Sequence, residues 1–473
     1  MAVVRPFSCV RPAAEHVAEI AALPYDVYNR EEAKREVKSH PLSFLAIDRP
    51  ETGFPDTADM YAPEVYAHAK DLFEQWVKDG NYVEDLNETY YLYELTMNDH
   101  SQTGIVACSS VDDYVNGVIK KHENTREEKE LDRIRHIDVM DAQSGPIFLA
   151  YRPVKRLKEL VALAKEENPL YNFISEDGIR HRVWKIGSGD MIKEIREEFE
   201  KLPATYIADG HHRAASAVKV ALKRRAEHPD APKDAPFNYF LSVLFSEDEL
   251  TILPYNRVVW DLNGHSEEEL LKEASKLFEV SGPLKEAVEP KERGEVGMYL
   301  GGTWYDLKLK AGVRPDDPVK GLDVSVLQEK FLAPVLGIGD PRTDKRIDFV
   351  GGIRGVKELE RRCEADMKIA FSMYPTSMEE LLSVADAGLL MPPKSTWFEP
   401  KLRSGIFIHR LKPETWGQPT GFLEIEMGLQ SWSRRYHRNL TSQERKEYCC
   451  GKDYFNRRPS DRSSSCRTLC RIS

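Results

Sequence analysis

Apolar side chains recur along this chain with two periods, that of a helix and that of a strand. Residues 63–79 carry apolar residues at helical spacing and predict an amphipathic helix. Residues 89–96 (TYYLYELT) are rich in aromatic side chains, and residues 104–110 (GIVACSS) follow after a short gap. These two segments predict the paired strands of a hairpin.

A second helix is predicted to begin near Thr125, because Thr125 and Glu128 have the spacing of a capping box. Its apolar stripe then follows at helical spacing: Leu131, Ile134, Ile137 and Met140. Residues 146–151 (PIFLAY) come after a short loop and are typical of a buried strand.

A short strand, a tight turn and a helix are predicted in succession at residues 204–226. Residues 204–208 (ATYIA) are apolar, residues 209–213 (DGHHR) form the turn, and residues 214–226 are rich in alanine. Strand–turn–helix units bind phosphate, because the amides at a helix N-terminus are unpaired and the helix dipole is positive there.

Weaker patterns complete the assignment of elements. Residues 1–50 are punctuated by Pro6, Pro12, Pro24 and Pro41 and read as short strands and turns. Further helices are expected at residues 157–165, 191–202, 267–278, 322–332 and 377–387. Strands and helices mixed throughout predict the α/β class, of the mixed α+β kind. No stretch approaches 18 apolar residues, so no membrane partner is expected.

Length and charge narrow the choice of protein class. The 473 residues correspond to about three domains or subdomains. The net charge of −11 is uneven, with +7 on residues 431–473 and therefore −18 on residues 1–430. An acidic body disfavours non-specific binding of nucleic acid, so no nucleic-acid partner is expected.

Cysteine usage and the first residues favour the cytoplasm. Only Cys9, Cys108 and Cys363 lie in the first 430 residues, which suits a reducing compartment and no disulfide framework. The N-terminal residues have no apolar segment typical of a signal peptide. We expect no structural metal or iron–sulfur cluster in the body of the chain.

The predicted turn at 209–213 is the strongest candidate for chemistry. Asp209 could cap the helix, bind a metal or take a proton, and Gly210 lets a ligand approach the backbone closely. His211, His212 and Arg213 add hydrogen-bond donors where phosphate oxygens would lie. The alternative is a capped helix with surface histidines.

A second candidate lies just before the Thr125 helix. Lys121, His122 and Glu123 bring a cation, an imidazole and a carboxylate to the approach to that helix. A carboxylate here could be the general base for a hydroxyl nucleophile. A solvated charged loop explains the same residues, so both readings stay open.

Two further loops contain residues suited to a ligand. Asp141 precedes the 146–151 strand and is, as the alternative to Asp209, a candidate ligand for Mg²⁺. Lys394, Ser395 and Thr396 lie in a proline-rich loop and could clamp an anion. An ordinary turn and a structural loop are the respective alternatives. The turns at Pro24–Asp26 and Tyr255–Arg257 are weaker candidates still.

Several familiar signatures are absent from the sequence. There is no paired C-x2-C zinc motif, no G-x-x-x-x-G-K-[ST] loop, no G-x-G-x-x-G after a strand and no G-x-S-x-G. The common nucleotide-binding loops and the hydrolase nucleophile elbow are therefore excluded.

Several of these segments together resemble the bacterial and archaeal family known as domain of unknown function 1015. The resemblance covers about residues 1–411. It rests on LPYDVY at Leu23–Tyr28, on His40–Glu51, on KKHENT and ELDRI within Lys120–Ile134, on SGPIFLAY at Ser144–Tyr151, on IADGHHRAASA at Ile207–Ala217 and on MPPKSTWFEPKLRSG at Met391–Gly405.

The DGHHR turn is also similar to that of the ParB/sulfiredoxin superfamily, which includes free-serine kinases. This resemblance implies a ParB/sulfiredoxin-like nucleotide-binding core with additional mixed subdomains. It implies that Asp209, His211, His212 and Arg213 hold a nucleotide or phosphate and that Glu123 is the base. It also points to serine or phosphoserine as the substrate.

The remaining residues, 412–473, depart from the family and are expected to form a disordered tail. Residues 417–426 (GQPTGFLEIE) resemble the opening of the glutamate synthase small subunit. The segment that follows lacks an apolar period and is rich in Arg, Ser and Cys. Readthrough or a frameshift explains it better than a genuine fusion.

The favoured function is a phosphotransferase acting on a small hydroxyl compound such as serine. The expected phosphate donor is ATP, ADP or pyrophosphate, with Mg²⁺. Catalysis is assigned to Glu123, Asp209 and His122, and we expect their two segments to meet in one cleft. Alternatives are phosphoserine hydrolysis, a non-catalytic ParB-like nucleotide-binding regulator and an accessory subunit of glutamate synthase.

Overall fold

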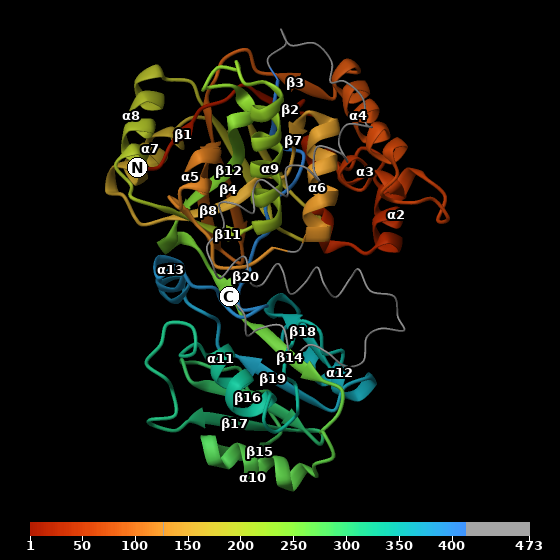
Figure 1. Cartoon of the computed structure of the whole chain (residues 1–473), viewed down its shortest axis with the longest axis vertical. Helices are drawn as coiled ribbons and strands as arrows, with labels where there is room; N and C mark the ends of the chain where they lie inside the picture. The colour runs from red at the N-terminus through yellow and green to blue at the C-terminus, as the bar shows by residue number, and fades with distance from the viewer. Residues whose placement is uncertain (126, 413–473) are drawn as a thin grey trace, which may run out of the picture. The chain divides into compact units, whose positions relative to one another are not determined.

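A computed structural model of the chain describes residues 1–412 except residue 126 (Figure 1). Within this part, residues 1–412 belong to one compact unit. Apart from residue 412, the expected tail, with its glutamate-synthase-like segment, lies outside the described residues. No helix of the described residues has both the length and the apolar character needed to cross a bilayer.

A mixed sheet of nine strands forms the centre of the first lobe, which we define as residues 1–251 and 399–412. Its strands run in the order β6–β11–β8–β12–β5–β4–β10–β9, and β1 pairs with β5. β8 and β12 are parallel, whereas β11 runs antiparallel to β8. Their bounds are β1 (Val4–Arg5), β4 (Tyr90–Met97), β5 (His100–Ser110), β6 (Ile119–Lys120), β8 (Ile147–Tyr151), β9 (Tyr171–Ile174), β10 (Arg180–Ile186), β11 (Thr205–Asp209) and β12 (Tyr239–Ser246).

Helices and a smaller sheet surround these strands. The helices are α1 (Val17–Ile20), α2 (Arg30–Ser39), α3 (Leu45–Asp48), α4 (Pro63–Lys78), α5 (Val111–Val115), α6 (Glu127–Met140), α7 (Lys155–Ala164), α8 (Gly189–Glu200) and α9 (His211–Glu227). The smaller sheet has the order β3 (Tyr82–Glu84), β2 (Cys9–Pro12), β21 (Ile408–Arg410) and β7 (Ala142–Gln143).

Helices α6 and α9 lie side by side and run in the same direction (Figure 1). Glu130, near the start of α6, pairs with Lys219, and Asp138, near its end, pairs with Lys223. The loop that leads into α6 and the turn that leads into α9 therefore lie at the same end of the helix pair.

The second lobe, residues 252–398, is built on an antiparallel sheet of six strands. In sheet order these are β15 (Phe278–Leu284), β17 (Thr303–Leu309), β16 (Glu295–Leu300), β19 (Ile369–Met373), β14 (Tyr255–Val259) and β18 (Ile347–Gly351). Its α-helices are α10 (Glu267–Leu277), α11 (Asp323–Leu327), α12 (Lys357–Ala365) and α13 (Met378–Asp386).

The chain crosses between the lobes at a two-stranded ribbon. β13 (Ile252–Leu253) leaves the first lobe and β20 (Trp397–Phe398) returns to it, and the two strands pair with each other. One apolar cluster continues across this ribbon, because Phe148 and Phe245 of the first lobe and Phe371 of the second belong to it. The chain that returns through β20 therefore leaves a packed apolar core and enters the first lobe directly.

The predicted elements are confirmed where their period is clear. α4 matches the predicted helix, and β4 and β5 form the predicted hairpin. The mixed α/β class is also confirmed. The predicted cap of α6 lies outside the described residues, because residue 126 and the side chain of Glu128 are not described.

The reading of residues 1–50 as short strands and turns is confirmed for β1 and β2 but misses the helices α1, α2 and α3. α2 occupies residues 30–39, and Asn29 with Glu32 forms a capping box at its start. Its apolar stripe is narrow, with only Ala33 fully buried, so the period was obscured by charged residues. The cap itself was a readable signal.

Candidate functional site

The strand β11 changes register against β8 immediately before its end. The shift falls between Ile207 and Asp209 and is followed by Gly210 at φ +92°. A residue other than glycine is strained at this φ. Helix α9 begins directly afterwards, so His211, His212 and Arg213 form its first turn rather than the predicted free turn. Amides of that turn lack partners within the helix.

Asp209 is an ion-pair partner rather than the cap of α9, since Gly210 occupies the N-cap position. Its Oδ2 lies 2.9 Å from Lys401 Nζ, and its Oδ1 accepts a hydrogen bond from the Gly210 amide at 2.7 Å. Burial opposes ionisation of Asp209, but Lys401 and Arg213 outweigh it and hold its pKa well below the usual value. Asp209 is therefore a stable anion and a weak base.

Lys401 is a site residue that the sequence analysis missed. Its ammonium lies 4.9 Å from the centroid of the Trp397 ring. Burial favours the neutral amine, but Asp209 overrides this and raises the pKa of Lys401. The sequence did contain a signal for Lys401, because it lies in the same segment as Lys394, which we assigned to anion binding.

His122 and His211 pack against each other at the start of α9. Their ring centroids are 4.5 Å apart with the planes at 85°, and both side chains are almost fully buried. Burial lowers the pKa of His122 to about 4 and the pKa of His211 well below its usual value. Both imidazoles are neutral, so the alternative of surface histidines is wrong for His211.

Glu123 approaches His211 from the loop that precedes α6. Its Oε2 lies 4.0 Å from His211 Nδ1, and about a third of its side chain (34%) is exposed. His211 Nε2 accepts a long hydrogen bond, 3.5 Å, from the His122 amide, which leaves the imidazole proton on Nδ1, toward Glu123. Burial and the Asp209 charge raise the pKa of Glu123 to about 7.

The Arg213 side chain lies across the start of β8 and borders a small cavity. Its Nη1 donates to the Pro146 carbonyl at 2.8 Å, and its side chain packs over Gly145 and Gly210. The cavity of about 30 Å³ has room for about one water molecule. Its polar lining includes Tyr25, Asp48, Arg133, His136, Gln143, Ser144 and Ser404.

Tyr25 and Arg133 are further residues that the sequence analysis undervalued. The Arg133 guanidinium lies 4.0 Å from the centroid of the Tyr25 ring. Burial raises the pKa of Tyr25 to about 12, although Arg133 opposes the shift. Tyr25 belongs to the LPYDVY segment, which we treated as a weak turn with one ionisable residue.

Asp141 is not placed with Asp209, so the two carboxylates named as candidate Mg²⁺ ligands do not share one site. Its carboxylate forms ion pairs with Arg224 and Lys412 at the far end of α9. Arg224 lies 11 residues beyond Arg213, which is roughly 16 Å along a helix. No group of three or more His, Cys, Asp or Glu side chains suited to a metal occurs among the described residues.

Of the three residues in the 391–401 segment that were predicted to bind an anion, one is exposed. Lys394 is exposed and lies close enough to Glu123 to counteract the rise in its pKa. Ser395 is buried and its hydroxyl donates to the Pro392 carbonyl at 2.6 Å, so it is not available to a ligand. Thr396 is half-buried beside it.

The 391–401 segment and the Glu123 loop are joined through the backbone as well. The Met391 amide donates to the His122 carbonyl at 2.8 Å. Lys121 is exposed in the same loop, and His212 is half-buried in the first turn of α9. The structure thus brings together Glu123, His122, His211, Asp209 and Lys401, and places Arg213 on the neighbouring face of the turn.

Residues 4–325 match the family model described as "Protein of unknown function (DUF1015)". No curated protein matches the chain.

Solved structures resemble the chain at low identity. A free serine kinase mutant in complex with AMP is 14% identical, with a TM-score of 0.34, over 65% of this chain and 92% of that chain. SbnI with a C-terminal truncation, from Staphylococcus aureus, is 15% identical, with a TM-score of 0.34, over 70% and 94%. A conserved hypothetical protein from Pyrococcus furiosus is 15% identical, with a TM-score of 0.30, over 64% and 94%.

Proposed function

We propose that this chain, which belongs to the DUF1015 family of proteins of unknown function, is a cytoplasmic phosphotransferase. It would transfer phosphate from a nucleotide or pyrophosphate to a small hydroxyl compound such as serine. One observation carries the proposal. A carboxyl group with a pKa of about 7, Glu123, faces the first turn of α9 at a distance of 4.0 Å from His211.

The first turn of α9 is the proposed phosphate site. Unpaired amides and the positive end of the helix dipole attract an anion. Arg213 packs over Gly210 at this turn and supplies positive charge there, and the exposed Lys394 adds a second cation that acts on Glu123. The ParB/sulfiredoxin-like DGHHR pattern supports the same assignment.

Glu123 is the proposed general base. A group with a pKa near 7 is ionised in a large fraction of molecules at neutral pH and still accepts a proton readily. As the acceptor oxygen bonds to phosphorus, its proton would pass to Glu123 and the bond between phosphorus and the donor oxygen would break. Neutral His211 would orient the Glu123 carboxylate through its Nδ1 proton.

The residues present fit a protein-held Mg²⁺ poorly. Mg²⁺ is usually bound by one or two carboxylates together with substrate phosphates. Asp209 already pairs with Lys401, and Asp141 pairs with Arg224. We therefore derive no step through a metal, and Mg²⁺ would enter with the phosphates of the donor.

Phosphorus NMR tests the proposal with the purified full chain. ATP, ADP and pyrophosphate are each mixed with serine, and we expect a new phosphate monoester signal with one donor. Glu123→Gln should abolish transfer and leave nucleotide binding intact. Glu364→Gln is the matched control, because Glu364 is exposed on α12 in the second lobe.

Two outcomes would contradict the proposed reaction. Nucleotide binding without transfer to any hydroxyl compound would favour the non-catalytic regulator. Release of inorganic phosphate from phosphoserine, without nucleotide, would favour hydrolysis. Arg213→Ala should weaken ADP binding in all of these cases if α9 binds phosphate.

A further inference from the structure

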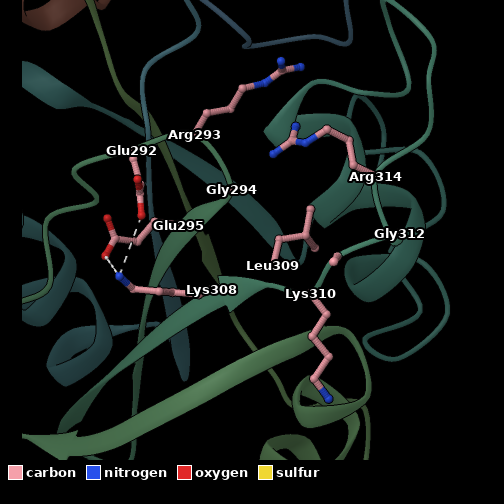
Figure 2. A pocket seen from close by; sticks show the side chains of 10 residues that line it. Glu292, Arg293, Gly294, Glu295, Lys308, Leu309, Lys310, Gly312 and Arg314 are labelled. Atoms are coloured by element: carbon pink, nitrogen blue, oxygen red, sulfur yellow. Dashed lines mark ion pairs between the residues drawn. The ribbon is translucent and has the colours of Figure 1, made fainter.

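A cavity of about 260 Å³ in the second lobe is lined by basic side chains, but its charges are compensated. Arg293 pairs with Glu380 at 2.8 Å, and Arg314 pairs with Asp323 at 2.6 Å. Figure 2 shows Lys308 turned toward two glutamates that line the same cavity. Cations that already form ion pairs do not require an added anion, so we propose no ligand for this cavity.

Arg257, on β14 in the same lobe, is in the opposite situation. It is buried, with 4% of its surface exposed, and among the described residues it forms no ion pair with a carboxylate. Its guanidinium donates only to main-chain carbonyls, those of Tyr255 and, at 3.1 Å, Lys394. Burial lowers its pKa to about 10, so it stays charged at neutral pH. A buried cation without a counterion is costly.

Lys394 adds a second cation at the same place. The carbonyl that Arg257 holds belongs to Lys394, whose φ of +60° is rare for a residue with a side chain. Its Nζ lies 5.3 Å from the centroid of the Tyr255 ring, and it forms no ion pair within the described part of the chain. A strained residue of this kind is characteristic of a functional site.

We propose that Arg257 and Lys394 form an oxyanion-binding subsite at the edge of the candidate active site. The ligand is a phosphate or carboxylate group, which supplies the counter-charge that the chain itself lacks. The guanidinium has five N–H donors, and its hydrogen bonds to the two carbonyls use two of its three nitrogen atoms. Its planar fork suits both oxyanions.

The subsite deepens the proposed phosphotransferase and rests on it for the identity of the ligand. Lys394 acts electrostatically on Glu123, the proposed base, so the charge of an oxyanion held here would act on the same carboxyl group. The oxyanion could be the terminal phosphate of the donor or the carboxylate of an acceptor amino acid. These two sources share one chemistry and are separated by experiment.

Calorimetry on the full chain tests the subsite with three probes: inorganic phosphate, ADP, and serine in the presence of saturating ADP. Arg257→Gln and Lys394→Gln should each weaken at least one of them by roughly tenfold to over a hundredfold, the range of a lost charge-assisted hydrogen bond. Arg361→Gln is the control, because Arg361 is exposed in the same lobe and pairs with Glu358.

The pattern of losses identifies the source of the oxyanion. Weaker binding of phosphate and ADP assigns the subsite to the donor, and weaker binding of serine alone assigns it to the acceptor. Circular dichroism checks each variant, and the exposed Lys394→Gln carries the test if Arg257→Gln does not fold. Wild-type affinity of both variants for all three probes would overturn the proposal.

The results expected if the subsite is wrong differ from those expected if the proposed phosphotransferase is wrong. If Arg213→Ala and Glu123→Gln lose binding and transfer while Arg257→Gln behaves as wild type, only the subsite is wrong. If no transfer occurs but phosphate binding depends on Arg257, the subsite stands and the phosphotransferase does not.

Discussion

Glu123 holds its proton near neutrality because burial and the Asp209 carboxylate both disfavour its charge. Lys394 and Lys401 oppose this shift and only partly offset it. Asp209, a short distance away, is held in the opposite state by Lys401. Two interacting carboxyl groups of the candidate site are therefore suited to different tasks, one to exchanging a proton and the other to holding a fixed charge.

The free energy of unfolding is expected to fall as pH rises from about 4.5 to about 7, through Glu123. The folded chain keeps the Glu123 proton up to about pH 7, whereas the unfolded chain loses it near 4.5. The folded state binds more protons in this window, so raising pH destabilises it. Urea unfolding at a series of pH values should show a smaller decline for Glu123→Gln. An unchanged decline would contradict the raised pKa.

The histidines and Lys401 mark the limit of what the sequence could predict about the site. The residue types around Glu123 and in the DGHHR segment indicated the correct region. Each of these two segments contains an unusual set of reactive side chains close together in sequence. Neutral charge states and the Asp209–Lys401 pair depend on burial and on residues 192 positions apart. No local spacing contains that information.

At the scale of elements, a clear apolar period predicted α4 and the β4–β5 hairpin correctly. The helix α2 was missed because charged residues obscure its apolar period. The start of α9 was placed three residues late. His211, His212 and Arg213 looked like turn residues, but Gly210 in the left-handed conformation reverses the chain by itself. The histidines are thereby carried into the first helical turn.

Gly210→Ala should destabilise the chain by roughly 1–3 kcal/mol, the cost of a side chain held at a left-handed φ. Its Cβ would also lie 3.1 Å from the Arg213 guanidinium, so ADP binding should weaken. Gly117→Ala is the control, because Gly117 has φ +76° and nothing within 4 Å of an added Cβ. Thermal unfolding should register both variants, and calorimetry only Gly210→Ala. Equal ADP affinity for the two would argue against phosphate binding at α9.

At the scale of the whole molecule, the second lobe is attached to both segments of the candidate site. Asp386, at the end of α13, accepts hydrogen bonds from Lys120 at 2.5 Å, Arg152 at 2.8 Å and the Tyr206 hydroxyl at 2.9 Å. Lys120 immediately precedes the Lys121–Glu123 loop, and Tyr206 lies on β11 before Asp209. Asp386 therefore links α13 to the two strands that lead into the site.

Asp386→Asn should loosen this attachment, because it removes the charge from two ion pairs. Hydrogen exchange is expected to rise in residues 119–123 and 205–209, while the interior of the second lobe stays protected. Asp366→Asn serves as the comparison, since Asp366 is an exposed partner of Arg362 within the second lobe. Faster exchange confined to α13 would show that Asp386 does not hold the first-lobe strands.

The late position of Lys401 has a consequence for the order of synthesis. β11 and α9 leave the ribosome well before the second lobe, so Asp209 is made about 190 residues ahead of its counter-ion. Domains generally fold in the order in which they are synthesised. A nascent chain that has folded its large sheet still has an unpaired carboxylate at this turn. The site is therefore completed only after the second lobe has been synthesised, when the chain returns from it.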